Sequence, residues 1–254
     1  MHTIGIDIGS SCAKTAVTDG QGNVLWTDQM PTGWSSLDAA EEIRRRLNAA
    51  GYDPENAPCI ATGYGRVVVP YAEKAVTEIT CHAKGAQKLF SLSDLDVIDI
   101  GGQDTKVICV RNGSVRDFLM NDKCSAGTGR FLEVMANTLA MDSPSLIELA
   151  GQGSDTSISS MCTVFAESEV ISLIGRGERK ENIAFAVVSS IAKKIASQAS
   201  RICGDSVQTV LTGGLCEADE LRKALEKELG RDIASCPDAR YAGAIGAALL
   251  AEKL

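Results

Sequence analysis

The sequence has few of the side chains on which several common kinds of active site depend. It contains two histidines, one of them His2, which argues against a Ser-His-Asp triad or a metal centre with several histidine ligands. No segment has the Walker-type phosphate loop of the most common ATPases. No two cysteines have the CxxC spacing of many metal sites. Any chemistry must therefore come from another arrangement of residues.

Basic side chains and long apolar runs are also scarce. The chain has 25 basic and 33 acidic residues and a net charge of -8, which argues against broad contacts with nucleic acid or anionic lipid. No apolar run approaches the roughly 20 residues that cross a bilayer, and no basic leader precedes the first strand-like segment. We expect a cytoplasmic protein with no membrane and no nucleic-acid partner.

The cysteines, by contrast, are numerous. Nine is a high and odd number, which does not suit a closed set of secreted-type disulfides. Four of them lie beside apolar or small residues and are expected to be small buried hydrophobes: Cys109, Cys203, Cys216 and Cys236.

One motif occurs twice. Residues 6–14 align without a gap on residues 98–106, and in each copy an apolar strand ends in Asp, passes through a Gly turn and continues into a second apolar run. A turn sequence follows each copy, at 19–23 and 111–113. Each copy predicts a β-hairpin.

Helical periodicity separates the strand-like segments. It covers residues 37–49, 76–89, 130–139, 164–174, 183–202 and 217–229. Interleaved helices and strands indicate the α/β class. We expect two domains, at 1–95 and 96–254, with a C-terminal helix near 241–248 that crosses back towards the first domain.

The Gly turns of the two copies suit a nucleotide. A turn with little side-chain obstruction presents backbone N–H groups to phosphate oxygens, and an Asp at a strand end can hold the waters of a Mg²⁺ ion. Lys14 would add a positive charge near the terminal phosphates. The residues concerned are Asp7, Gly9, Ser10 and Ser11 in the first copy and Asp99, Gly101 and Gly102 in the second.

A third apolar strand ends in another glycine pair, Gly213 and Gly214, which permits close approach of an adenosine. Together the three motifs resemble those of the actin, Hsp70 and sugar kinase superfamily. The resemblance implies two ribonuclease H-like domains with an ATP cleft between them, with the Mg²⁺ carboxylate at Asp7 and a second acidic position at Asp99. Gln103 is expected to orient the attacking water, and a surface turn residue is the alternative.

Two cysteines differ from the rest. Cys124 and Cys162 each precede a helical pattern, and a helix N-terminus favours a thiolate or an anionic ligand. A [4Fe–4S] cluster ordinarily needs four thiolates, so two such cysteines per chain suggest one cluster shared across the two-fold axis of a dimer. A pair of capping or buried thiols is the alternative.

Several longer runs look like the activators of 2-hydroxyacyl-CoA dehydratases, in a wider family that includes the ATPase subunits of benzoyl-CoA reductases. The runs are 61–66, 78–86, 98–104, 121–132 and 162–171. The resemblance implies a homodimer that holds one [4Fe–4S] cluster, with Cys124 and Cys162 as ligands. Cys81 and His82 lie in one of these runs but are left out of the cluster. Glu167 and Glu169 are expected to support a helix N-terminus, and a role in coupling is the alternative.

The expected function is therefore an ATP-hydrolysing electron donor in an anaerobic cell. A reduced ferredoxin or flavodoxin would supply the electron, and a partner dehydratase would receive it. A benzoyl-CoA-type or double-cubane-cluster reductase is an alternative acceptor. A small-molecule kinase without a cluster, or a regulatory ATP-binding module, is an alternative from another class.

Overall fold

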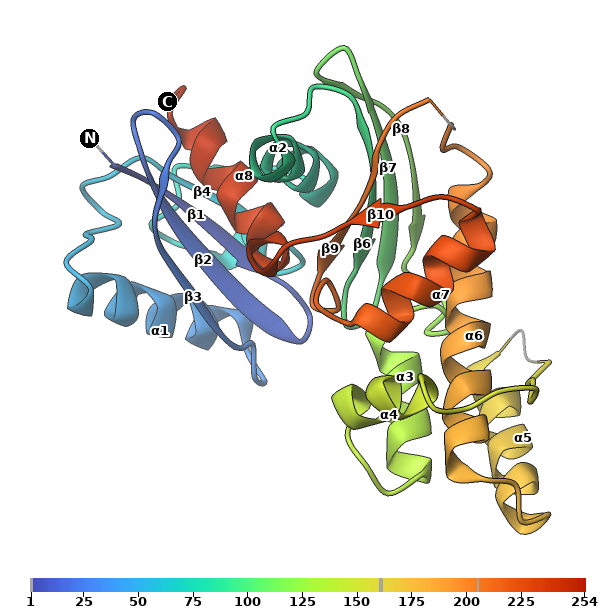
Figure 1. The fold of residues 1–254 in the computed structure, drawn as a ribbon. Helices are drawn as coiled ribbons and strands as arrows, with labels where there is room; N and C mark the ends of the chain where they lie inside the picture. Colours follow the sequence, from blue (N-terminus) through green and yellow to red (C-terminus); the bar gives the residue numbers. More distant parts are fainter. Residues whose placement is uncertain (1, 160–161, 205) are drawn as a thin grey trace. The chain divides into compact units, whose positions relative to one another are not determined.

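A computed structural model describes residues 2–159, 162–204 and 206–254 of the chain (Figure 1). The chain forms two compact units. Unit 1 comprises Met1–Val97, Val110–Arg116 and Asp238–Leu254, and unit 2 comprises Ile98–Cys109 and Asp117–Pro237. The chain thus passes from unit 1 into unit 2, returns to unit 1 for a short segment, builds the rest of unit 2 and ends in unit 1.

The first sheet has five strands in the order β3-β2-β1-β4-β5. Its strands are β1 (His2–Ile8), β2 (Cys12–Asp19), β3 (Val24–Pro31), β4 (Cys59–Thr62) and β5 (Lys74–Ala75). β1 pairs antiparallel with β2 and parallel with β4. Because β1 lies in the middle of the sheet, it is buried from its second residue onward and reads as an almost continuous apolar run.

Helices cover both faces of this sheet. They are α1 (Ser36–Ala49), α2 (Glu78–Phe90) and α8 (Ala242–Ala251), with short 3₁₀ turns η1 (Arg66–Val68) and η2 (Pro237–Tyr241). The isoleucines of β1 pack with α1, whereas Thr3, two residues before Gly5, donates its hydroxyl to Ala248 of α8 at 2.9 Å. Alternate residues of a strand point to opposite faces, so Asp7 lies on the face covered by α8.

Glycines allow α8 to approach closely. A Cβ atom at Gly5 of β1 would overlap the backbone of Ala244, and one at Gly85 of α2 would overlap Ala242. Helix α2 therefore packs against α8, and α8 packs against the sheet, at backbone contact distance.

The second sheet repeats the first. Its order is β10-β9-β6-β7-β8. Read from the other end, this is the order of the first sheet, with β6 in the place of β1, β7 of β2, β8 of β3, β9 of β4 and β10 of β5. Its strands are β6 (Leu95–Ile100), β7 (Thr105–Arg111), β8 (Ser114–Asn121), β9 (Thr209–Gly213) and β10 (Ile233–Ala234). The repeat read in residues 6–14 and 98–106 therefore extends to the whole sheet.

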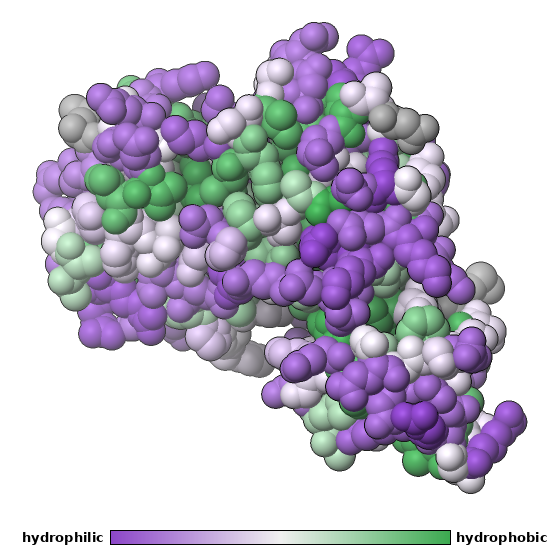
Figure 2. All heavy atoms as spheres, viewed as in Figure 1, coloured by the Kyte–Doolittle hydropathy of each residue, from purple (hydrophilic) through white to green (hydrophobic). Residues whose placement is uncertain are grey.

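One large hydrophobic core holds unit 2 together, formed by β6, β7 and β9 with the surrounding helices. The helices are α3 (Gly129–Thr138), α4 (Ser143–Ala150), α5 (Thr163–Gly175), α6 (Lys180–Ala199) and α7 (Asp219–Leu229). The solvent-facing sides of α1 and α7 are hydrophilic (Figure 2).

The helices expected from periodicity are present, with ends shifted by a few residues. Helix α4 was not predicted from periodicity, although its start has both local signals of a helix N-terminus. The Asp142 carboxylate accepts from the backbone N–H of Ser145 at 2.8 Å, and Pro144 lies in the first turn. None of the described helices is both long enough and apolar enough to cross a membrane.

Candidate functional site

The first phosphate turn joins β1 to β2 in unit 1. The Gly9 N–H donates to the Cys12 carbonyl at 3.1 Å, and the Gly9 carbonyl accepts from the Thr32 hydroxyl at 2.7 Å. Ser10 and Ser11 are exposed at the tip. The hydrogen bonds of Gly9 thus fix the base of the turn, while Ser10 and Ser11 at its tip stay accessible to a ligand.

Asp7 is the last carboxylate before this turn, and it is 7% exposed. Its Oδ2 lies 3.6 Å from Nε2 of His82, a buried residue of α2. A Cβ atom at Gly243 of α8 would overlap both side chains. Asp7 is therefore held between α2 and α8, and His82, which the sequence reading left aside, is its neighbour.

Lys14 is the cross-strand partner of Asp7 in the β1–β2 ladder. Its side chain is partly exposed and makes no ion pair with any residue that the structure describes. A lysine in this state keeps its charge available for an anionic ligand.

In the second copy, in unit 2, a buried lysine lies beside the strand-end aspartate. Asp99 is 2% exposed, and Nζ of the buried Lys106 lies 3.5 Å from Asp99 Oδ2 and 2.7 Å from Asp104 Oδ2. The Thr212 hydroxyl also donates to Asp99 Oδ1 at 2.8 Å. Sequence reasoning assigned no role to Lys106 or Asp104, although Lys106 aligns with Lys14 in the repeat.

Gln103 is exposed in this second turn, and no hydrogen bond of its side chain to another described residue is found. Its assignment as the residue that orients water stays a prediction.

The glycine pair at 213–214 follows β9 and meets the second copy. The Gly214 N–H donates to the carbonyl of Ile100, the residue after Asp99, at 3.1 Å. Gly213 has φ +90°, and a Cβ there would overlap the Ile100 backbone. Only glycine allows strand β9 to run this close to the end of β6.

Unit 1 has a counterpart that the sequence reading missed. Gly63 follows β4 with φ +89°, and a Cβ there would overlap the carbonyl of Ile8, the residue after Asp7. The Gly65 N–H donates to the same carbonyl at 2.9 Å. The signal was present in the sequence, because the Thr-Gly dipeptide at 62–63 repeats that at 212–213.

The two cysteines that were singled out differ in local structure. Cys162 is the N-cap residue of α5, as expected. Cys124 is not at a helix N-terminus, because α3 begins only at Gly129 with Thr128 as its N-cap. A turn intervenes, in which Gly127 has φ +92°. The expectation for Cys124 was therefore wrong in its local structure, and any effect of the α3 dipole on this thiol is weaker than expected.

Hydrogen bonds nevertheless bring the two cysteine segments together. The hydroxyls of Ser125 and Thr163, each next to one of the cysteines, are 2.8 Å apart. The Asn121 amide donates to the Cys124 carbonyl at 2.9 Å. Both thiols are partly exposed. Ser160 and Met161, directly before Cys162 in the sequence, lie outside the described residues.

Hydrogen bonds also connect the segment between Cys124 and α3 to the second phosphate turn. The N–H groups of Gly129 and Arg130, at the start of α3, donate to the carbonyls of Gly101 and Gly102 at 2.9 and 2.7 Å. The Thr105 hydroxyl donates to the Gly127 carbonyl at 2.5 Å. A displacement of this turn would therefore be transmitted to the loop that carries Cys124.

The remaining cysteines divide by burial, and all nine are free thiols. Cys109 and Cys216 are buried as expected, whereas Cys203 and Cys236 are partly exposed, so the expectation was wrong for those two. Burial raises the pKa of the Cys59 thiol to about 12. Burial likewise raises the pKa of Cys81 to about 12, against a smaller lowering by the Thr62 hydroxyl.

The two glutamates after Cys162 have different partners. Both Glu169 carboxylate oxygens accept from Ser159, from its N–H at 2.7 Å and its hydroxyl at 2.6 Å. Glu167 accepts from the Thr138 hydroxyl of α3 at 3.2 Å. Glu169 thus fixes the segment that leads to the start of α5, while Glu167 joins α5 to α3.

Comparison with known proteins identifies the family. The chain matches the BadF/BadG/BcrA/BcrD ATPase family over residues 4–251. It is 42% identical to the (R)-2-hydroxyglutaryl-CoA dehydratase activating ATPase of Acidaminococcus fermentans, covering 100% of this chain and 98% of that protein.

Solved structures agree with the sequence match. The crystal structure of A. fermentans (R)-2-hydroxyglutaryl-CoA dehydratase component A superposes with a TM-score of 0.93 at 41% identity, over 100% of this chain and 98% of that one. The activator of the 2-hydroxyisocaproyl-CoA dehydratase from Clostridium difficile, with bound ADPNP, gives 0.91 at 35% identity, over 100% and 95%. The expected α/β class with two actin-like ATPase domains is confirmed, as is the resemblance to the dehydratase activators. The chain belongs to the BadF/BadG/BcrA/BcrD ATPase family.

Proposed function

We propose that the protein is an ATP-hydrolysing activator that donates a low-potential electron to a partner 2-hydroxyacyl-CoA dehydratase. The similarity to two dehydratase activators over the full length of the chain supports this function over that of a small-molecule kinase. A benzoyl-CoA-type or double-cubane-cluster reductase is the alternative acceptor.

The proposed nucleotide chemistry uses the residues at the strand ends. The turns at Gly9, Ser10 and Ser11 and at Gly101 and Gly102 contact the phosphate oxygens. The N–H groups of Gly9 and Gly101 donate to carbonyls within the turns, so Ser10, Ser11 and Gly102 supply the N–H groups for the phosphates. Asp7 holds the waters of a Mg²⁺ ion, and Lys14 contacts the terminal phosphates. Gln103 orients the attacking water, and Gly213 and Gly214 leave room for the adenosine.

The domain assignment is part of the proposal. Residues 1–95 and 96–254 form the two ATPase domains, and the C-terminal helix belongs to the first. The packing of α8 against β1 and α2 within unit 1 supports this assignment.

Cys124 and Cys162 are the proposed ligands of a [4Fe–4S] cluster. When bound, such a cluster supplies a site that accepts and donates one electron at low potential. The donor set fits, because the two partly exposed thiols lie on segments that the Ser125–Thr163 hydrogen bond joins. One chain offers two of the four thiolates, so a second copy of the chain supplies the others.

The apolar surface of α5 supports a homodimer. Val164, Phe165 and Ile171 are 66%, 69% and 56% exposed, and the helix that carries them begins directly after Cys162. A helix that is apolar on its exposed side as well as its buried side is expected to be covered. A second copy of α5 is the proposed cover, since it would also bring the missing cysteines.

The observation that carries the proposal is the hydrogen-bonded connection within unit 2. The carbonyls of the turn at 101–102 accept from the N-terminus of α3, and the loop before α3 contains Cys124. Ser125 in that loop bonds Thr163 in the first turn of α5. Nucleotide state at the turn can therefore bias the position of both cysteines, which is what an ATP-driven electron donor requires.

The proposed setting is the cytoplasm of an anaerobic cell. Cytosolic thiols stay reduced and available as ligands, and low-potential sites lose electrons to oxygen. A reduced ferredoxin or flavodoxin is the proposed source of the electron.

Anaerobic purification tests this function. We expect about four irons and as many acid-labile sulfides per dimer, with an EPR signal after reduction by dithionite. Both should be lost in Cys124→Ala and Cys162→Ala and retained in Cys203→Ala, a partly exposed cysteine of the same unit. An iron-free wild-type dimer with ATPase activity would contradict the proposal.

A second experiment tests the connection itself. Ser125→Ala removes the hydrogen bond to Thr163 without removing a ligand. We expect iron content and ATP hydrolysis to persist while electron transfer per ATP hydrolysed falls. Unchanged transfer in this variant would show that the two segments are coupled in another way.

A further inference from the structure

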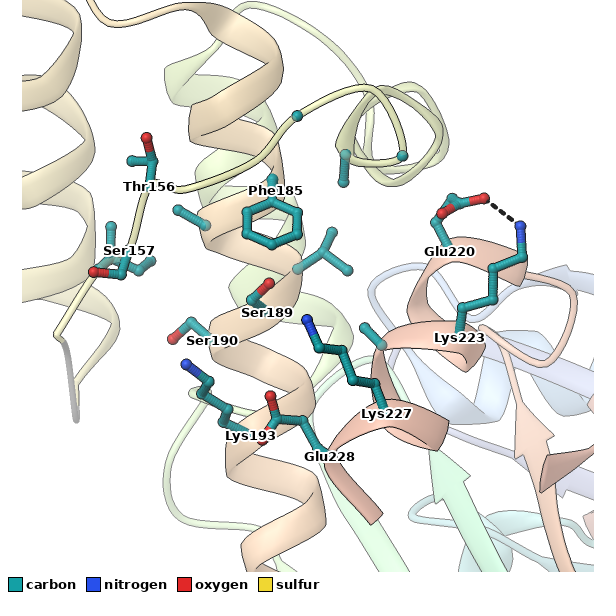
Figure 3. Close-up of a pocket in the computed structure, with 17 residues that line it drawn as sticks. Thr156, Ser157, Phe185, Ser189, Ser190, Lys193, Glu220, Lys223, Lys227 and Glu228 are labelled. Atoms are coloured by element: carbon teal, nitrogen blue, oxygen red, sulfur yellow. Dashed lines mark hydrogen bonds and ion pairs between the residues drawn. The ribbon is translucent and has the colours of Figure 1, made fainter. Parts of the chain in front are cut away.

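A pocket in unit 2 lies apart from every residue assigned above. It has a volume of about 290 Å³ and is formed where α6, α7 and the segment at 150–158 meet (Figure 3). All of its walls come from one unit, so its shape follows from the packing of that unit alone. A hollow of this size accepts a small organic molecule.

Lysines dominate the polar lining. Lys223 is paired with Glu220 at 2.7 Å, but Lys193 and Lys227 make no ion pair or hydrogen bond with any described side chain. Lys227 extends from α7 towards Ser189 of α6, and Lys193 lies beside Ser190 (Figure 3). Glu228 also lines the pocket, which leaves three positive and two negative side chains around it. This positive excess occurs in a chain whose net charge is -8.

The rest of the lining combines hydroxyls with apolar surface. Ser189 and Ser190 lie side by side in sequence in the middle of α6, and no hydrogen bond of either hydroxyl to another described group is found. The half-buried ring of Phe185 and the buried side chain of Ile158 supply an apolar wall. A few polar groups on an apolar wall are typical of sites for small ligands.

We propose that this pocket binds a small organic anion. Its carboxylate or phosphate group accepts hydrogen bonds from Lys193, Lys227 and the hydroxyls of α6, and its apolar part contacts Phe185. Charge-assisted hydrogen bonds of this kind are the stronger class, and their geometry suits either anion.

The place of the pocket in the fold gives the ligand a regulatory role. The segment at 150–158 runs towards Cys162, and α7 follows the glycine pair at 213–214. A ligand that contacts both stabilises one arrangement of these elements over others, which is the requirement for an effector. Binding itself does not depend on the function proposed above.

Calorimetric titration of the nucleotide-saturated protein tests the site. ADP and Mg²⁺ are present in excess so that the phosphate turns are already occupied. The probes are inorganic phosphate, acetate and phenyl phosphate. We expect at least one probe to bind with a Kd of about 1 mM or tighter, and phenyl phosphate to bind more tightly than inorganic phosphate because of its ring.

Variants locate the binding. The double variant Lys193→Ala, Lys227→Ala should weaken binding by about tenfold or more. Lys180→Ala, an exposed lysine on the same helix outside the pocket, should leave it unchanged. Phe185→Ala should remove the advantage of phenyl phosphate over phosphate.

The bare anions separate the two possible ligand classes. Tighter binding of acetate than of phosphate assigns a carboxylate, and the reverse assigns a phosphate. Absence of binding by all three probes, or binding that the double variant retains at full strength, would overturn the proposal.

Discussion

Unit 1 and unit 2 carry the same five-strand order and the same strand-end aspartate, but they surround that aspartate with different partners. Asp99 has a buried lysine at 3.5 Å and a donating threonine, whereas Asp7 has a histidine at 3.6 Å. An ordinary lysine is charged at neutral pH and an ordinary histidine is mostly not. Asp99 therefore lies beside a buried lysine, whereas the described neighbour of Asp7 is an imidazole.

The aligned lysines differ in the same sense. Lys106 is buried against two carboxylates, and Lys14 is partly exposed with no such partner among the described residues. Duplication of a motif thus does not duplicate its chemistry. In one copy the lysine is buried between two carboxylates, whereas in the other it is partly exposed.

Removal of Lys106 should have the largest effect on stability. Lys106→Met leaves Asp99 and Asp104 without their shared cation, and loss of one partner of a buried ion pair costs about 3–5 kcal/mol. Lys14→Met should change the free energy of unfolding by less than about 0.5 kcal/mol and weaken nucleotide binding instead. Denaturant unfolding and nucleotide titration of both variants measure the difference. Equal destabilisation by the two substitutions would contradict the proposed difference between Lys106 and Lys14.

The two aspartates should separate catalysis from stability. Asp7→Asn should lower the rate of ATP hydrolysis by about 10²-fold, as does loss of other electrostatic groups at reacting phosphates and carbonyls. Asp99→Asn should also destabilise the fold, because Lys106 then loses one of its carboxylates. Steady-state hydrolysis and thermal unfolding report the two effects. An Asp7→Asn variant with full activity would remove Asp7 from the proposed site.

Substitution of the glycines that follow β4 and β9, Gly63 and Gly213, should destabilise the fold to a similar degree. Gly63→Ala and Gly213→Ala each place a Cβ against a backbone carbonyl at a φ near +90°, which should cost about 1–2 kcal/mol or more. Gly175→Ala, where a Cβ would meet nothing within 4 Å, is the control and should be nearly neutral. A large difference between the first two variants would show that β4 and β9 do not have equivalent roles.

The smallest effect concerns thiol chemistry. Cys59 and Cys81 of unit 1, with pKa values of about 12, should resist alkylation by iodoacetamide near pH 8 in the native state, while the partly exposed Cys124 and Cys162 of the cluster-free protein react. Peptide mapping by mass spectrometry measures the extent of alkylation at each of these cysteines.

The raised pKa values also set the sign of a pH effect. Ionisation of these buried thiols is easier in the unfolded chain, so stability should fall as the pH rises from about 9 towards 12. Rapid labelling of Cys81 near pH 8 would contradict the burial on which this prediction depends.

The sequence alone determined what is encoded by neighbouring residues. The strand-end aspartates, the glycine turns, the periodic helices and the unusual setting of Cys162 all depend on contacts within a few residues. The full five-strand order was not readable, because β4, β5, β9 and β10 are short and their partners are distant in the chain.

Only the tertiary structure decided which of the aligned charged residues are buried in ion pairs and which are partly exposed. Lys14 and Lys106 occupy aligned positions, yet burial beside Asp104 made one of them structural. His82 and Gly243 reach Asp7 only because α8 packs on β1 and α2 packs on α8. The Ser125–Thr163 bond likewise joins residues from separate segments. Such contacts depend on how the whole chain folds back on itself, and no local pattern specifies them.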